Sequence, residues 1–318
     1  MTTPTAPVGA DRHARRGLLQ VCATGVLWGT GGLAAHVLHD RDGLLAGVTS
    51  AWRMGIAAVA LLLAVLAVRQ GPAVAALLRR HPVRAVLLGL ATAAYQGLYF
   101  AAVLATGVGV ATVVSLGLAP VMVTVVECAR ERRAPHLREV LSLTAALTGL
   151  VLVSVAGTSG GTGPSPGLGV VLAVLAAVGY AATTLVGRTV SQSTPPLALT
   201  TVSTTVGALV LLPWAAVEVA GGAPAVPSDV VGVAWLAWLG LATMALAYGL
   251  LYAGLRTTTS GAATIATLLE PVTAAVLAAL LLDERLGVLG VVGGVLILLA
   301  VAARSDGEGG APPHPSRR

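Results

Sequence analysis

Charged residues are scarce in this 318-residue chain, at 10% of the sequence, whereas hydrophobic residues make up 56%. Soluble domains carry roughly 25% charged residues, so the composition excludes a protein surrounded by water. The mean hydropathy is +0.88, and the apolar residues fall into blocks of about 20, the length of a helix that crosses a ~30 Å hydrocarbon core. The chain is therefore predicted to be an all-α integral membrane protein in contact with the lipid bilayer.

Lysine is missing altogether, so the 19 basic residues are all arginines. The pI of about 10.1 would suit a nucleic-acid-binding protein. The arginines, however, gather in alternate connections between the apolar blocks, and only Arg41 and Arg285 fall in the connections on the other side. Because cytoplasmic connections are enriched in basic residues, this pattern predicts two cytoplasmic termini in a multi-pass protein of the bacterial cytoplasmic membrane. It argues against a nucleic-acid partner.

Disulfides and nucleotide-binding motifs are not implied either. The two cysteines, Cys22 and Cys128, lie in or beside predicted membrane helices on the cytoplasmic side, so they form no disulfide framework. No GxxxxGK[ST] loop is present, so ATP-driven pumping by this chain alone is unsupported, and no cofactor is predicted. The GxxxG spacings Gly25–Gly29 and Gly290–Gly294 are candidate helix-packing faces, either within the bundle or in a homodimer.

The apolar blocks predict ten transmembrane helices in two groups of five. Residues 1–16 and 304–318 are predicted to be disordered cytoplasmic ends, and the Gly-rich stretch 157–166 is predicted to link domains 17–156 and 167–303. The predicted helices cover approximately residues 17–38, 44–68, 83–105, 109–128, 138–156, 167–187, 197–217, 230–254, 258–281 and 286–303.

An internal repeat relates the two groups. A shift of about 150 residues aligns Trp28 with Tyr180, "QGLYFAA" with "YGLLYAG", and the mid-helix prolines Pro120 and Pro271 with each other. Because each group has an odd number of helices, the second repeat must be inverted in the membrane relative to the first. Inverted repeats with interrupted helices are typical of secondary transporters, whose substrate site lies near the bilayer midplane between the repeats.

Several short stretches carry a resemblance to a known family. They are "WG" at Trp28–Gly29, Arg53 in the second helix, "LAP" in the fourth, and "LEP" followed by "LLLDERLG" near the ninth. Over roughly residues 17–303 the chain resembles the drug/metabolite transporter superfamily, EamA type. The resemblance implies two EamA-like repeats and a secondary active transporter for a small organic metabolite such as an amino acid, nucleoside or drug-like compound, with export favoured. The Arg-rich connection "ECARERRAPHLRE" departs from the family pattern, and its role stays open.

Two ionisable residues fall deep inside predicted membrane helices. Glu270 is expected about 18 Å into the ninth helix, and Arg53 about 14 Å into the second. Such groups cost about 2.5–3.5 kcal/mol each on insertion scales, and they persist where they face a cavity or one another. Three interpretations stay open: the two residues bind substrate in a cavity, with Glu270 able to carry a coupling proton; they form a permanent salt bridge; or Glu270 is protonated and only hydrogen-bonded.

Further polar and aromatic side chains fall at mid-depth, where an interfacial belt does not need them. We predict that they line the substrate cavity together with Arg53 and Glu270, the alternative being ordinary hydrogen bonding between helices. These residues are Trp28, Tyr95, Gln96 and Tyr180. Tyr252 lies nearer the membrane boundary and is predicted to belong to the interfacial belt.

The two aligned prolines are predicted to be hinges. Neither Pro120 nor Pro271 has an N–H, so the carbonyls of Leu116 and Thr267 lose their helical partners. Their matched positions in the repeats favour a hinge or cavity role, whereas a passive kink is the alternative.

One stretch offers a different chemistry. In "HVLHDRD", His36 and His39 lie three residues apart and are followed by Asp40 and Asp42, a spacing that metal ligands can have. No second Cys or His cluster completes a site, so no metal is predicted. An integral membrane enzyme with an interfacial site and a non-transporting scaffold are the alternatives to transport. The chain is predicted not to be an enzyme.

Glu127, amid charged neighbours, is predicted to be part of a solvated cluster.

Overall fold

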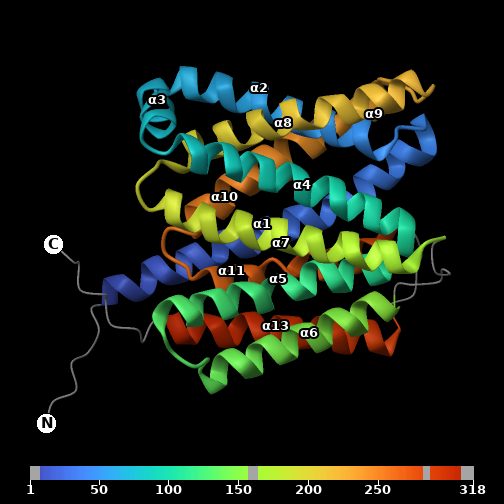
Figure 1. Cartoon of the computed structure of the whole chain (residues 1–318). Helices are drawn as coiled ribbons and strands as arrows, with labels where there is room; N and C mark the ends of the chain where they lie inside the picture. Colours follow the sequence, from blue (N-terminus) through green and yellow to red (C-terminus); the bar gives the residue numbers. More distant parts are fainter. Residues whose placement is uncertain (1–7, 157–163, 282–286, 309–318) are drawn as a thin grey trace, which may run out of the picture.

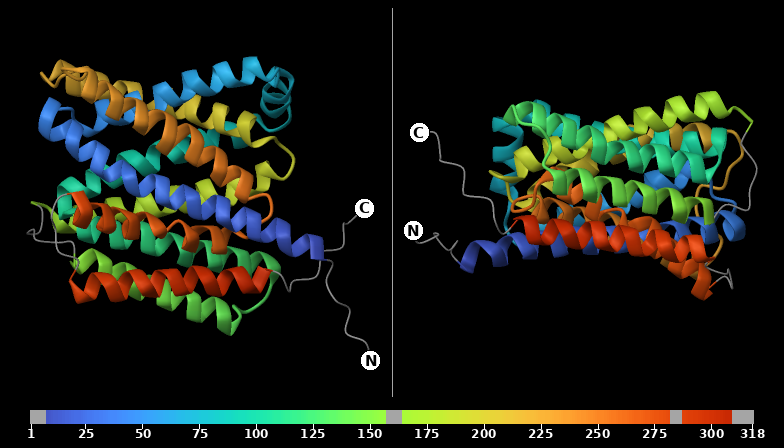
Figure 2. Two further views of the ribbon diagram at one scale, coloured as in Figure 1. Left: turned by 180° about the vertical axis from the view of Figure 1, so that it is seen from behind. Right: turned by 90° about the horizontal axis from the view of Figure 1, so that it is seen from below.

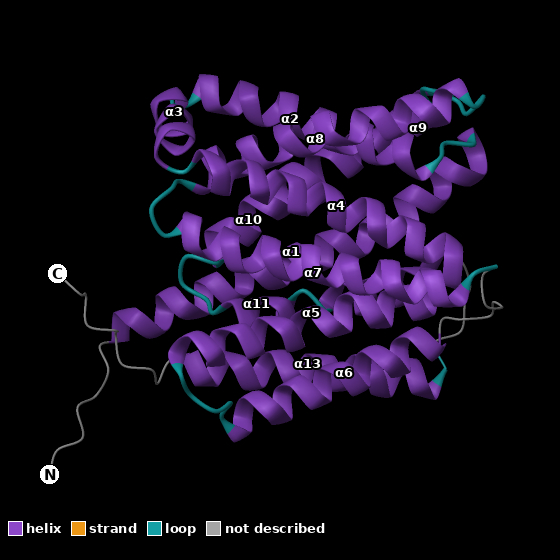
Figure 3. Ribbon diagram, in the orientation of Figure 1, coloured by secondary structure: helices purple, strands orange, loops and turns teal. Residues whose placement is uncertain are grey.

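The computed structural model describes residues 8–156, 164–281 and 287–308, and in these ranges every regular element is a helix (Figures 1 and 3). The first half of the chain forms α1 (Val8–Asp42), α2 (Ala46–Ala67), α3 (Gly71–Arg80), α4 (Pro82–Thr106), α5 (Val108–Glu131) and α6 (Leu137–Ala156). The second half forms α7 (Pro166–Ser191), α8 (Pro196–Ala220), α9 (Val230–Gly240), the π-helix η1 (Leu241–Leu246), α10 (Ala247–Gly254), α11 (Ser260–Ala266), α12 (Leu269–Leu281) and α13 (Val288–Glu308).

Most of these helices are long and apolar enough to cross a membrane. Within the described ranges there are 9 such spans, with α9, η1 and α10 counting as one and α11 with α12 as another. Helix α13 is apolar over the shorter segment Val288–Arg304. The predicted all-α membrane fold is confirmed.

The structure corrects the predicted chain ends and one connection. Helix α1 begins at Val8 and α13 continues to Glu308, so residues 8–16 and 304–308, predicted to be disordered, are helical. Alanine and arginine, abundant near both junctions, are good helix formers. The remaining parts of the predicted ends, and residues 157–163 of the predicted linker, lie outside the described residues. The connection after α2 contains the unpredicted helix α3, with a proline in its first turn and Arg79 and Arg80 in its last.

The helix contacts follow a two-fold pattern. Helix α7 contacts α4 and α5 of the first half of the chain. In the equivalent way, α1 contacts α9, α10 and α12 of the second half. The remaining large contacts pair equivalent helices, α2 with α8 and α6 with α13. Figures 1 and 2 show the α6–α13 pair at one side of the bundle, the α2–α8 pair at the other, and α1 and α7 between them. This is the arrangement that two related five-helix units produce.

Very close backbone contact joins α6 to α13. A Cβ on Gly149 would lie 2.5 Å from the carbonyl oxygen of Gly293, and a Cβ on Gly293 would lie 2.6 Å from that of Gly149. Only glycine permits this approach, which gives apolar helices a large van der Waals contact where lipid provides no hydrophobic driving force.

Both described chain ends lie at the same end of the bundle (Figure 1). We call this end the terminal face; it also carries α3 and the connections α5–α6, α7–α8 and α10–α11. The opposite end, the distal face, carries the connections α1–α2, α4–α5 and α8–α9. Among the described residues, arginines crowd the terminal face, whereas at the distal face Arg41, in the last turn of α1, is the only one.

Candidate functional site

The helix that carries Glu270 is broken just before it. Helix α11 ends at Ala266 and α12 begins at Leu269. Pro271 has no N–H that could donate to the carbonyl of Thr267. That carbonyl accepts a hydrogen bond of 2.9 Å from the backbone N–H of Glu270 instead. Glu270 therefore lies in the first turn of α12, where free N–H groups and the helix dipole stabilise a negative charge. Proline is also tolerated there because its missing N–H would have had no helical acceptor.

The helix opposite is irregular as well. Between α9 and α10 the chain forms the π-helix η1, a distortion that is frequent at functional sites. The carbonyl of Thr243 in η1 accepts a weak hydrogen bond of 3.4 Å from Nη2 of Arg53 on α2. Close packing of α9 on α2 supports this contact, since a Cβ on Gly240 would lie 2.6 Å from Ile56. Arg53 is thus held toward the centre of the bundle by a backbone carbonyl.

A cavity of about 270 Å³ lies between these two irregular helices and α1, α2, α4 and α5. We call it the polar chamber. Five of the six predicted binding residues line it, namely Trp28, Arg53, Tyr95, Gln96 and Glu270. Thr49, Ser50, Tyr99 and Tyr248 add further polar groups to its wall. Both repeats contribute to the lining, as expected for a site at the repeat interface.

Tyr180, the sixth predicted residue, lies behind this wall. It is fully buried and stacks on Tyr95 with ring centroids 5.0 Å apart, and its edge meets Trp28 at 6.2 Å. Its hydroxyl is paired with that of Thr267, at the break between α11 and α12. Tyr180 therefore supports the lining residues and the helix break, and it is not among the residues that line the polar chamber.

Tyr248 is a lining residue that the sequence prediction missed. Its ring contacts Trp28 at a centroid distance of 5.1 Å. The repeat alignment could have identified it, because Tyr248 aligns with Gln96, which was predicted to line the cavity. Tyr252 is a correction: it is fully buried and packs 6.0 Å from Tyr248, so it belongs to the core and not to an interfacial belt.

Several polar atoms in the wall of the polar chamber have no partner. Among the described residues, Nε1 of Trp28, Nε of Arg53 and both amide atoms of Gln96 are buried without a hydrogen bond. Trp28 and Gln96 are only 6% and 4% exposed. Buried polar groups are nearly always paired, and each unpaired one costs about 1–3 kcal/mol. The unmet hydrogen-bonding capacity of these atoms makes the polar chamber the candidate binding site.

Arg53 and Glu270 face the same chamber without a direct contact. Within the described chain no ion pair joins them, although they are near enough for their charges to attract. Glu270 also lines a second cavity of about 300 Å³, which we call the apolar chamber. The two chambers share Trp28, Gly32, Tyr99, Val108 and Glu270.

The predicted hinge prolines differ in their surroundings. Pro271 lies beside the apolar chamber, directly after the break before α12. Pro120 is buried inside α5, which continues through it without interruption. Only the second of the two aligned prolines therefore accompanies a broken helix.

The comparison with known proteins agrees with this architecture. Residues 15–155 and 167–304 each match the EamA-like transporter family. The chain belongs to the EamA-like transporter family. The two matched segments correspond to α1–α6 and α7–α13, so the predicted family is confirmed.

Two relatives support the assignment. The "Uncharacterized transporter YwfM" of Bacillus subtilis (strain 168) is 27% identical over 226 residues, which cover 68% of this chain and 70% of that protein. A solved structure described only as "Crystal structure of protein" covers 90% of this chain and 95% of its own, with a TM-score of 0.74 and 17% identity. At that identity the likeness shows a shared fold.

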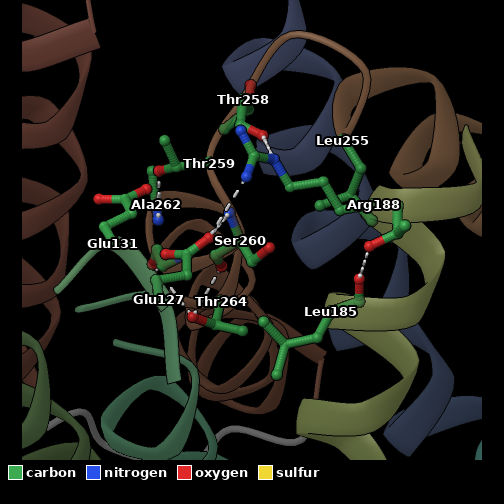
Figure 4. Close-up of polar contacts among 12 residues, drawn as sticks. Glu127, Glu131, Leu185, Arg188, Leu255, Thr258, Thr259, Ser260, Ala262 and Thr264 are labelled. Carbon is green, nitrogen blue, oxygen red and sulfur yellow. Dashed lines mark hydrogen bonds and ion pairs between the residues drawn. The ribbon is translucent and has the colours of Figure 1, made fainter. Parts of the chain in front are cut away.

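In this EamA-family chain, a carboxylate of one repeat caps the broken helix of the other at the terminal face (Figure 4). Glu127 on α5 accepts hydrogen bonds of 3.0 Å from the backbone N–H groups of both Ser260 and Gly261. Arg188 on α7 lies 3.6 Å from Glu127 and donates to the carbonyl of Thr258 at 3.1 Å. The prediction that Glu127 belongs to a solvated cluster is wrong, because its partners come from a distant part of the sequence.

The Arg-rich connection between α5 and α6 also has defined partners. Arg133 pairs with Glu139 at 2.6 Å and with Glu131, and Glu139 lies 3.7 Å from Arg304 on α13. The hydrogen bonds that the Arg133 guanidinium donates to Glu139 and Glu131 raise its pKa above the usual value. This connection therefore ties α5, α6 and α13 together at the terminal face.

The "HVLHDRD" stretch is occupied by structural contacts at the distal face. Asp42 accepts hydrogen bonds from the backbone N–H and the hydroxyl of Ser228, and the ring of His39 lies 3.1 Å from the carbonyl oxygen of Leu44. The side chain of His36 lies outside the described residues. Within the described chain, no group of three His, Cys, Asp or Glu side chains could hold a metal ion.

Proposed function

We propose that this EamA-family protein is a secondary transporter that moves a small organic metabolite across the cytoplasmic membrane by alternating access, with export favoured. The polar chamber is the binding site, and Trp28, Arg53, Tyr95, Gln96 and Glu270 contact the solute. The observation that carries this proposal is the set of buried, unpaired polar atoms on Trp28, Arg53 and Gln96. Packing alone would not retain them, whereas a polar solute would satisfy them.

The charges of the polar chamber favour a solute of a particular kind. A guanidinium binds a carboxylate through parallel hydrogen bonds, and a carboxylate binds an ammonium. Arg53 and Glu270 therefore suit a solute that bears both groups, and the aromatic rings of Trp28, Tyr95 and Tyr248 suit its apolar part.

Alternating access requires that the chamber open to each face in turn. The break before α12 and the π-helix η1 leave short helical segments on both sides of the chamber. Such interruptions are where transporter helices bend. Pro271, and Pro120 as its counterpart in the first repeat, supply the hinges in this proposal. Glu270 is the candidate proton carrier, since intramembrane carboxylates commonly serve in proton relays.

Transport by purified protein in proteoliposomes tests the proposal. The panel consists of amino acids, nucleosides and cationic drugs, assayed with and without a pH gradient. We expect Arg53→Gln to reduce uptake of carboxylate-bearing solutes by roughly tenfold or more, because a charged hydrogen bond is worth about 1.5–3 kcal/mol. We expect Glu270→Gln to abolish the response to the gradient and to weaken the binding of solutes that bear an ammonium, whereas solutes without an ammonium should still bind.

Charge changes outside the chamber provide matched controls. Arg79→Gln and Glu131→Gln remove the same kinds of charge from exposed positions at the terminal face and should leave transport intact. If Arg53→Gln and Glu270→Gln both transport normally, the two charges are structural and the proposed site is wrong. If the solute is recovered in a chemically altered form, the protein is an enzyme and the transporter proposal is wrong.

A further inference from the structure

A groove of about 550 Å³ lies between α6 and α13, on the flank of the bundle that these two helices form (Figures 1 and 2). We call it the flank groove. None of the residues that line it also lines the polar or the apolar chamber. In a membrane this flank faces the lipid, so the proposed transport function gives the flank groove no role.

The flank groove has the shape of a shallow apolar channel. Ser142 and Ala300 are buried at its floor, whereas Leu137, Leu141 and Leu299 are exposed at its edges. Its lining residues on α6 extend for about 12 Å along the helix axis. This length is close to the ~15 Å of hydrocarbon in one leaflet of a bilayer. The channel therefore offers contact along most of the depth of one leaflet.

The end of the flank groove at the terminal face carries a positive charge. Arg138 lines the groove from the first turn of α6, and no hydrogen bond or ion pair joins its guanidinium to another described residue. The carboxylate of its neighbour Glu139 is engaged by Arg133 and Arg304. A cation in the first turn also opposes the helix dipole. The charge of Arg138 thus serves neither an internal ion pair nor the stability of α6, and it is available to an external anion.

The combination of a cation and an apolar channel favours a lipid over a second copy of this chain. A two-fold related copy would bring the same patch to both sides of the interface, so two Arg138 side chains would repel each other there. An anionic phospholipid has the complementary chemistry, because its phosphate binds a guanidinium through charged hydrogen bonds and its acyl chain is apolar. The ammonium of a zwitterionic lipid would be repelled by the arginines of the terminal face.

We propose that the flank groove binds an anionic phospholipid, with its phosphate at Arg138 and one acyl chain along Leu141 and Leu299. Basic pockets between membrane helices on the cytoplasmic side bind such headgroups, and the terminal face is the end predicted to be cytoplasmic. Because α6 belongs to the first repeat and α13 to the second, the lipid contacts both repeats. This site goes beyond the proposed function and does not depend on it.

Photolabelling by lipids of defined charge tests the site. The full chain is reconstituted in phosphatidylcholine liposomes that contain a trace of phosphatidylglycerol or phosphatidylcholine with a diazirine in one acyl chain. The labelled residues are mapped by peptide mass spectrometry. We expect label at residues 137–145 and 299–303, with about fivefold more from phosphatidylglycerol, the factor that one arginine near the membrane surface contributes for an anionic lipid.

Two pairs of variants separate the charge of the flank groove from its shape. Arg138→Gln should lower labelling by phosphatidylglycerol to the level of phosphatidylcholine. Arg79→Gln, which removes an exposed arginine of α3 on the opposite flank of the terminal face, should keep the fivefold difference. Ala303→Leu fills the groove and should reduce its labelling by both lipids severalfold. Ala156→Leu makes the same change at an exposed position of α6 outside the groove and should leave labelling unchanged.

Three outcomes would overturn the proposal. Equal labelling of the flank groove by the two lipids in the wild type excludes a preference for anionic lipid. An equal decrease in Arg138→Gln and Arg79→Gln indicates a general attraction to the basic face instead of a site. A groove that neither lipid labels holds no lipid, and a disulfide between two copies that carry Leu141→Cys, in a background of Cys22→Ala and Cys128→Ala, would then assign it to a second copy.

Discussion

At the scale of single residues, Glu270 is tolerated because of where its helix begins. A carboxylate in the middle of a continuous apolar helix would lack free N–H donors and would lie far from the positive end of the helix dipole. The break at Thr267 converts the same position into the first turn of a helix, where the helix dipole favours a negative charge. The aligned residue in the first repeat is Ala119, inside the unbroken α5. The helix break and the charge thus occur together, in one repeat only.

Two glycines one turn apart on α1 should respond oppositely to alanine. Gly29→Ala would place a Cβ 2.5 Å from the side chain of Thr273 and 2.6 Å from the carbonyl of Glu270, so we expect a loss of about 1–3 kcal/mol. Gly32→Ala meets nothing within 4 Å and should be neutral or stabilising by up to about 1 kcal/mol. Thermal unfolding of the two detergent-solubilised variants provides the comparison. Equal destabilisation would contradict the packing of α1 on α12.

At the scale of helices, α11 depends on a carboxylate from the other repeat. This helix has 7 residues, too few to be stable by itself. Glu127 holds two of its N-terminal N–H groups, and Thr259 caps a third, that of Ala262. The segment that leads to Glu270 is therefore anchored at the terminal face by α5.

Removing that anchor should loosen α11 selectively. We expect Glu127→Ala to accelerate amide hydrogen exchange in residues 260–266 by roughly tenfold, which corresponds to ~1.4 kcal/mol of lost capping. Glu131→Ala, an exposed carboxylate one turn further along α5, is the matched control and should leave that segment unchanged. Exchange that rises equally in both variants would indicate a general charge effect instead of a cap.

At the scale of the whole molecule, the arginines predict the orientation in the membrane. The terminal face is rich in arginine and should be cytoplasmic by the positive-inside rule. In a background with Cys22→Ala and Cys128→Ala, we introduce Ser193→Cys in the α7–α8 connection and Val226→Cys in the α8–α9 connection, both exposed. A membrane-impermeant maleimide should label Val226→Cys in intact cells and Ser193→Cys only in inside-out vesicles. The reverse pattern would invert the proposed topology.

Candidate residues in the chamber could be inferred from the sequence because membrane energetics act on each residue separately. An arginine, glutamate or glutamine at mid-depth is costly wherever the helix lies, so Arg53, Gln96 and Glu270 were identifiable from depth alone. Tyr180 shares their depth but stacks behind Tyr95. Depth in the membrane does not say toward which side of its helix a residue points. That direction decides whether the residue lines the polar chamber or packs behind its wall.

The sequence by itself determined the membrane class, the approximate positions of the membrane-spanning helices, the repeat and the family. These properties depend on composition, on blocks of apolar residues and on spacing along one chain. Only the tertiary structure decided that Glu127 caps a helix 133 positions away, that Tyr252 is core, and that the central space consists of two chambers. Such features arise from contacts between remote segments, because helix packing sets which side chains meet and where they leave room.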